Sequence, residues 1–174
     1  MVYLLLILLG KLELHMTRNI PVYDVHWYGP FDPESLPDDL NQNHVLYMIC
    51  GTHGLYGRNV PLYIGKTQRD VYRRLKEHGW MRDEPDPPKV YTACIGEFIS
   101  WEDNELIENY PPPPHQLIES IESLLIIAHQ CAYNSRSKAQ KAVGDYDLAI
   151  FNTGRRATLF PEVSSRYWAP ARIA

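Results

Sequence analysis

The segment PLYIGKTQRDVYRRLKEH, which runs from Pro61 to His78, decides how the fold of this 174-residue chain is predicted. A short run of β-forming residues ends at Gly65, and five Lys or Arg residues and one histidine follow before the segment ends. Thr67 can cap a helix, and Gly79 can end it. The i, i+3, i+4, i+7 spacing then places four residues on one helical face: Val71, Arg74, Leu75 and His78. The segment therefore predicts a strand, a tight turn and a basic helix.

Further strands and a second helix are predicted around this segment. His44–Cys50 is a strand candidate, and the glycine-rich stretch after it is typical of a hairpin loop, so Val60–Ile64 is the antiparallel return strand. Lys89–Trp101 is rich in β-forming residues and predicts a third strand. A proline run leads into a second amphipathic helix over about residues 115–130, and YDLAIFNTGRR predicts a later strand and turn.

Composition narrows the class of protein. With 45% apolar and 22% charged residues, the chain has the make-up of an ordinary globular protein with one domain-sized core. Its three cysteines are scattered and form no CxxC pair, so we expect reduced thiols, a cytoplasmic protein and no zinc knuckle. The apolar run Val2–Leu9 is too short to cross a bilayer, which takes about 20 residues, and we expect no membrane partner.

The charge of the chain is unevenly distributed. A net charge of −4 argues against a protein that binds nucleic acid over its whole surface. Positive charge is instead concentrated in the quoted segment, with smaller groups at residues 136–141 and at Arg155 and Arg156. Such local patches are compatible with a phosphate-bearing ligand.

Several polar residues fall where the predicted elements would bring chemical groups together. Tyr47 and Tyr63 lie near the ends of paired strands, and Gly65 would allow a ligand to approach the backbone. Arg74 lies on an apolar helical face and needs a partner, because an unpaired buried charge is costly. Glu122 lies beside the apolar face of the second helix. Taken singly, these residues also fit ordinary strand tyrosines, a surface arginine and a carboxylate at the rim of a core. Together with the lysine after Gly65, they could hold a divalent cation and a phosphate.

The order and spacing of these motifs resemble a GIY-YIG nuclease domain. The resemblance covers about residues 44–135 and rests on VLY at 45–47, YIGKT at 63–67, RRLKEH at 73–78, a helical glutamate and the downstream YN at 133–134. It implies an α/β (α+β) fold with a small three-stranded, mainly antiparallel sheet flanked by helices.

The same resemblance divides the chain. Residues 41–153 would form the nuclease core. Residues 1–40 would be an N-terminal extension, and the several Pro and Asp residues and the glycine within residues 17–43 predict an ordered loop there. Residues 154–174 would be a C-terminal extension.

Carried over position by position, the resemblance implies a catalytic set of five residues: Tyr47, Tyr63, Arg74, His78 and Glu122. Glu122 would bind one Mg²⁺ or Mn²⁺ ion, and Tyr47 would act as general base or orient the attacking water. A second set would bind the nucleic acid or its phosphates: Gly65, Lys66, Arg69, Arg73, Lys76 and Asn134.

The sequence departs from the family's pattern at three points. Val45-Leu46-Tyr47 replaces the first triplet, of which the tyrosine alone is expected to reach the chemistry. The gap between the two tyrosines is longer than in compact members. One extra residue before Arg74 leaves Arg73 as a rival for the catalytic arginine, although Arg74 shares a helical face with His78.

The implied function is that of a metal-dependent DNA endonuclease, most like the restriction-type members, that forms a homodimer at least on DNA. Val2–Leu9 and the tail LFPEVSSRYW are the expected dimer contacts, because neither belongs to the predicted catalytic core. Two alternatives stay open. One is a non-catalytic nucleic-acid-binding or interaction domain on the same fold, and the other is a metal hydrolase of small phosphate esters.

Overall fold

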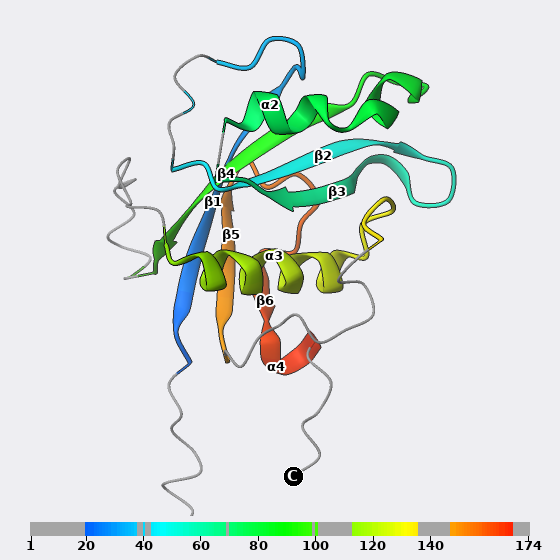
Figure 1. Ribbon diagram of the computed structural model, residues 1–174. Coiled ribbons are helices and arrows are strands. Elements are labelled where there is room, and N and C mark those ends of the chain that lie inside the picture. Colours follow the sequence, from blue (N-terminus) through cyan, green and yellow to red (C-terminus); the bar gives the residue numbers. More distant parts are fainter. Residues whose placement is uncertain are drawn as a thin grey trace, which may run out of the picture.

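The structure is a computed structural model that describes residues 20–37, 40, 43–68, 70–98, 100, 113–135 and 147–168. Its strands are β1 Val22–Phe31, β2 Leu46–His53, β3 Gly57–Lys66, β4 Lys89–Glu97, β5 Ala149–Gly154 and β6 Glu162–Ser164. Its helices are α2 Val71–Lys76, the 3-10 helix η1 Gly79–Asp83, α3 His115–His129 and α4 Ser165–Trp168. The strands form one sheet in the order β3-β2-β4-β1-β5-β6, and Figure 1 shows that β2 and β3 run across the direction of β1 and β5. The sheet is therefore strongly twisted.

The predicted hairpin is present as β2 and β3, and β4 pairs with the other side of β2. All three pairings in this half of the described sheet, including that of β4 with β1, are antiparallel, whereas β1 and β5 pair parallel. Side chains along β2 alternate between two packed faces. Leu46 and Met48 belong to a large core that includes α3, and Tyr47 and Ile49 belong to a smaller cluster that includes α2.

The prediction of a small three-stranded, mainly antiparallel sheet is wrong, because the sheet is mixed and has six strands. The largest error concerns β1, which was expected to be loop. This strand lies between β4 and β5, and its Val25 and Trp27 are fully buried. Without β1, strand β4 would leave its edge unpaired and the apolar residues on it uncovered.

The C-terminal segment, expected to be an extension available for dimer contacts, also contributes to the sheet through β6. Leu159 and Val163 are buried in the main core, so much of the tail packs within its own chain. Phe160, Tyr167 and Trp168 remain exposed. The other expected dimer contact, Val2–Leu9, lies outside the described residues.

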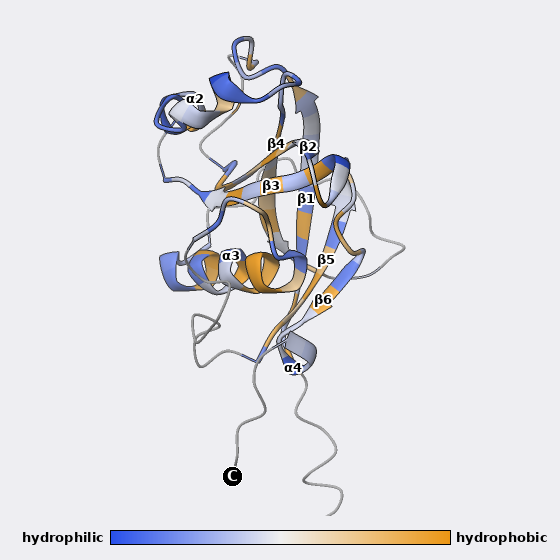
Figure 2. Cartoon of the chain, turned by 90° about the vertical axis from the view of Figure 1, so that its right-hand side faces the viewer, coloured by the Kyte–Doolittle hydropathy of each residue, from blue (hydrophilic) through white to orange (hydrophobic). Residues whose placement is uncertain are grey.

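Helices α2 and α3 lie on opposite sides of the β2–β3 hairpin (Figure 1). In Figure 2, α3 carries a hydrophobic stretch and α2 is mostly hydrophilic, in keeping with the size of the cluster that each covers. The cap of α2 is Asp70, whose side chain accepts from the Tyr72 N–H at 2.9 Å, and the prediction of Thr67 as the cap is wrong. Of the helices described, none has the length and apolar character needed to span a membrane.

His129, at the end of α3, has a buried ring nitrogen, Nε2, that finds no hydrogen-bond partner within the described part of the chain. Its ring lies 4.8 Å from the ring of Phe160, measured between centroids. Burial lowers the pKa of this imidazole from 6.5 to about 4, because the charged form would lose its hydration.

We predict that His129 makes the fold acid-sensitive. Because the folded-state pKa lies below the unfolded value, the unfolded chain binds the proton first, and stability is lost as pH falls from 6.5 to about 4. The loss attributable to this residue is about 3 kcal/mol. Urea unfolding at pH 7 and pH 4 measures it, and His129→Leu should lose correspondingly less stability over that interval. An equal loss in both proteins would contradict the prediction.

Candidate functional site

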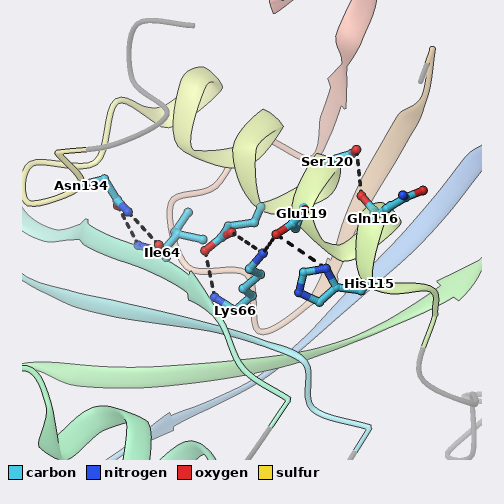
Figure 3. Close-up of polar contacts among 8 residues, drawn as sticks. Ile64, Lys66, His115, Gln116, Glu119, Ser120 and Asn134 are labelled. Atoms are coloured by element: carbon cyan, nitrogen blue, oxygen red, sulfur yellow. Dashed lines mark hydrogen bonds and ion pairs between the residues drawn. The ribbon is translucent and has the colours of Figure 1, made fainter. Parts of the chain in front are cut away.

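The outer edge of β3, the last strand on one side of the sheet, is covered by α3 and the turn after it. Tyr133 donates its backbone N–H to the Leu62 carbonyl at 2.8 Å. The side-chain amide of Asn134 accepts from the Ile64 N–H at 2.9 Å and donates to the Ile64 carbonyl at 2.8 Å (Figure 3). Asn134 is buried and uses both of its polar groups on one residue of the strand. It therefore positions β3, and we assign it that role in place of the predicted phosphate contact.

Glu122 continues this row of contacts from α3. Its Oε1 accepts from the backbone N–H of Lys66 at 3.0 Å, and its Oε2 lies 3.9 Å from the Lys66 Nζ. The Lys66 ammonium is hydrogen-bonded to Glu119, whose carboxylate also lies 3.6 Å from Nδ1 of His115 (Figure 3). Burial raises the pKa of Glu122, and the charge and N–H of Lys66 oppose that shift. Its side chain is still 18% exposed, so the carboxylate can be reached from solvent.

Tyr47, Tyr63 and His78 form a compact group on the other face of the hairpin. The Tyr47 hydroxyl lies 2.8 Å from Nε2 of His78. The two tyrosine rings stack with centroids 6.0 Å apart, and the His78 ring lies 4.5 Å from that of Tyr63. Burial raises the pKa of Tyr47, so the phenol is protonated at neutral pH.

His78 is held in its neutral form. Burial lowers the pKa of the imidazole, and the positive charge of Arg74 lowers it further. With both partners neutral, the contact to Tyr47 is a hydrogen bond whose direction is set by the tautomer of the ring. His78 also lines a cavity of about 770 Å³ beside α2 and η1, which gives the ring an approach from solvent.

Arg74 connects the two faces electrostatically. Its guanidinium is ion-paired with Glu77 on the same helix. Its positive charge lowers the pKa of Tyr47 and also that of Glu122, in each case against the larger effect of burial. Arg73 is exposed and figures in neither shift. Of the two rival arginines, Arg74 is thus the one placed beside the other predicted residues.

Gly65 has a different role from the one predicted. It pairs with Tyr47 across the hairpin, and a Cβ at this position would lie 2.5 Å from the Tyr47 hydroxyl oxygen and 2.8 Å from Cε1 of Tyr63. The absence of a side chain therefore allows the two rings to pack against the strand, rather than leaving open space for a ligand.

The remaining residues that were predicted to contact phosphate do not form one basic patch in the described structure. Lys66 is paired with the carboxylates of α3. Lys76 is exposed, and its Nζ lies over the ring of Tyr72, 4.2 Å from the centroid. Arg69 lies outside the described residues.

Two residues at this site were missed by sequence reasoning. The rings of Trp80 and Tyr133 pack edge to face with centroids 4.7 Å apart, and Trp80 lies 5.9 Å from His78. Trp80 follows His78 by two positions at the end of the basic segment, which is a weak signal for its place at the site. Nothing in the local sequence indicates that Tyr133 would reach it.

Glu122 offers one carboxylate that could serve as a ligand to a hard divalent cation. Carboxylate oxygens are the ligands that Mg²⁺ prefers, and Mg²⁺ sites in proteins often use one or two carboxylates and take the rest of the shell from water and phosphate. Across the described ranges, no group of three or more His, Cys, Asp or Glu residues could hold a metal. An ion at Glu122 would therefore depend on substrate oxygens and water for most of its shell.

We predict that Gly65→Ala disrupts this group of rings. The added methyl cannot avoid Tyr47 or Tyr63, so one ring must move, at a cost of about 1–3 kcal/mol in stability. Denaturant unfolding measures the change. Gly79→Ala is the matched control, because a Cβ there meets no atom within 4 Å and should change stability far less. Equal effects of the two substitutions would contradict the packing described here.

Comparisons of the chain with protein-family models, with curated proteins and with solved structures find no match. Its function is therefore argued from the residues and from the geometry of this site.

Proposed function

We propose that this protein is a metal-dependent DNA endonuclease that hydrolyses phosphodiester bonds. The observation that carries the proposal is the grouping of Tyr47, Arg74 and Glu122 around the end of β3, where the charge of Arg74 acts on both other residues. Hydrolysis of a phosphodiester needs a group that positions the attacking water, a cation for the developing charge and a ligand for a metal ion. These three residues offer one of each.

The metal would be one Mg²⁺ or Mn²⁺ ion held by Glu122. When bound, such an ion supplies charge stabilisation at the phosphate oxygens. The carboxylate must be ionised to hold it, and the N–H and ammonium of Lys66 favour that ionised form. Glu119 keeps the Lys66 ammonium engaged and leaves Oε2 of Glu122 the less crowded oxygen.

Tyr47 and His78 would handle the proton of the attacking water. The Tyr47 oxygen can take that proton while its own proton passes to Nε2 of neutral His78, 2.8 Å away. Neither group has to be ionised at rest, which matters because burial opposes the tyrosinate. Arg74 and Tyr63 would stabilise the charge on the phosphate.

A site with one metal and one tyrosine can cut one strand at each encounter. Double-strand cleavage therefore requires two copies that face opposite strands, and we propose a homodimer on DNA, as in a restriction-type enzyme.

The experiment that tests the function is incubation of supercoiled plasmid with Mg²⁺ or Mn²⁺ and with an EDTA control. Linear product is expected. Intact plasmid together with intact single-stranded circular DNA under all conditions would refute the nuclease, and nicked circles alone would refute the dimer. Turnover of bis(4-nitrophenyl) phosphate without plasmid cleavage would point to a small-ester hydrolase.

We predict that Glu122→Gln abolishes plasmid cleavage and retains DNA binding. The substitution removes the negative charge that would hold the metal but keeps an oxygen to accept from the Lys66 N–H. The control is Glu162→Gln, which removes an exposed carboxylate on β6 at the opposite edge of the sheet and should keep its activity. Cleavage by Glu122→Gln at the rate of the unsubstituted protein would remove this residue from the site.

A further prediction separates the two arginines of α2. Arg74→Ala should lower the cleavage rate by about 10²–10³, the usual effect of losing one preorganised contact to developing charge. Arg73→Ala should have a much smaller effect, because Arg73 acts on neither Tyr47 nor Glu122. Single-turnover cleavage rates decide between them, and a larger loss in Arg73→Ala would show that the two residues have been assigned the wrong way round.

A further inference from the structure

A continuous row of aromatic rings extends from the candidate site to the tip of the β2–β3 hairpin. We call its outer part, Tyr56, His53, Tyr133 and Trp80, the aromatic track. Its successive ring centroids are 4.8, 6.2 and 4.7 Å apart. From Trp80 the row continues into the site, with 5.9 Å to His78 and 4.5 Å from there to Tyr63. The track is thus joined to the candidate site by ring contacts alone.

The track is assembled from three segments that are distant in the sequence. Its residues come from the hairpin, from η1 and from the turn after α3, and Figure 1 shows these segments gathered at one end of the molecule. The Tyr133 ring is further fixed by its hydroxyl, which donates to Oε1 of Glu84 at 2.8 Å. Its backbone N–H is bonded to β3, so the turn that carries it is held in place.

Two of the four residues of the track are exposed, Tyr56 at 52% and Tyr133 at 39%. His53 is half-buried, and Trp80 is half-buried and packs against the smaller core cluster. Leu55, next to Tyr56 in the sequence, is 81% exposed. Rings that served stability alone would gain most by full burial. A cluster of large apolar side chains that stays in water and adjoins a candidate catalytic site is typical of a binding surface.

We propose that the aromatic track binds the bases of an unpaired nucleic-acid strand whose scissile phosphate lies at the Tyr47–Arg74–Glu122 site. Bases of a single strand stack on exposed aromatic side chains, at about 1–3 kcal/mol per base. Bases within a duplex are already stacked on one another and offer no free face. The preferred substrate is therefore a nucleic acid with an unpaired segment next to the bond that is cut. This inference rests on the proposed function, because a nucleic acid is chosen as the ligand of the track on the ground that the adjoining site is proposed to act on phosphodiesters.

The negative net charge of the protein gives little electrostatic attraction for a nucleic acid, so we expect base stacking to be the main source of its affinity. The chain carries a net charge of −4, and the carboxylate of Glu84 accepts a hydrogen bond from Tyr133 of the track. Proline-rich peptides also bind aromatic grooves, but they bring no phosphate to Arg74 or to a metal at Glu122. The continuity of the track with those residues favours a nucleic acid.

The test measures binding apart from cleavage. Full-length Glu122→Gln protein is titrated, with EDTA present, against a fluorescein-labelled oligothymidylate of about 12 nucleotides, within the usual site size of such surfaces, and against a duplex of equal length. The single strand should bind more tightly. Tyr56→Ala and Tyr133→Ala should each weaken single-strand binding about 5- to 150-fold. Both should leave the slope of log K against log salt unchanged, because stacking releases no counterions.

Matched variants separate stacking from loss of structure. Tyr56→Phe and Tyr133→Phe keep the ring and should bind like the parent, although Tyr133→Phe loses the bond to Glu84. Tyr167→Ala removes a tyrosine of α4 that is 83% exposed and lies outside the track, and it should change nothing. Tyr56 is at the hairpin tip, so its removal should leave the melting temperature in place.

Two results would overturn the inference. Equal binding of single strand and duplex, unaffected by Tyr56→Ala and Tyr133→Ala, would show that the track carries no bases. Binding of a labelled decaproline peptide in place of oligothymidylate would assign the track to a protein partner. Plasmid cleavage by the unsubstituted protein is measured separately. If cleavage occurs but the tyrosine variants bind normally, the nuclease proposal stands and the track proposal falls.

Discussion

The covering of the outer edge of β3 by α3 is the constraint on which the candidate site depends. Alternate residues of an edge strand direct their backbone groups outward, where they can pair with other chains unless they are covered. Here the outward groups of Leu62, Ile64 and Lys66 are taken in turn by Tyr133, Asn134 and Glu122. The contacts that protect the edge also fix the helix along the strand. Glu122 is therefore held beside the point where β3 ends, and Tyr133 is held within the aromatic track, between His53 and Trp80.

The two-residue period of the strand divides the chemistry between the two faces of the hairpin. Tyr63 and Gly65 face Tyr47 and α2, whereas Lys66 turns to the carboxylates of α3. The α2 face is buried and close to neutral, because burial raises the pKa of Tyr47 and lowers that of His78. The α3 face is anionic. Arg74 acts on both, so the end of the strand is where a proton-transfer pair and a metal-binding carboxylate could serve the same phosphate.

Sequence patterns predicted the elements whose signals are local and missed those whose signals are not. The hairpin was found through its glycine-rich loop, β4 through its β-forming residues, and α2 and α3 through helical spacing. Strand β1 was missed because Gly29 and Pro30 are typical of a loop, while the alternation of Val25 and Trp27 is brief. The partners that make it a strand are β4 and β5, more than half of the chain away in the second case.

For the candidate site too, local sequence signals guided the predictions and non-local contacts were missed. Arg74 was favoured over Arg73 by helical spacing, and in the structure the charge of Arg74 acts on both Tyr47 and Glu122, whereas Arg73 contributes to neither pKa shift. The cap of α2 was misplaced because the N–H of Thr67 still bonds to Val45, so the chain follows β2 at that point and the helix begins only after Asp70.

Two of the basic residues in the segment Pro61–His78 form ion pairs within the protein. Lys66 is paired with Glu119, and Arg74 is paired with Glu77. Under the proposed function, a phosphate would have to exchange with these carboxylates, and exposed pairs are worth about 1 kcal/mol or less, so the exchange would be feasible but would add little affinity. In a chain with net charge −4, contacts that do not depend on charge would then have to supply much of the proposed binding, and the proposed discrimination between paired and unpaired strands follows from that balance.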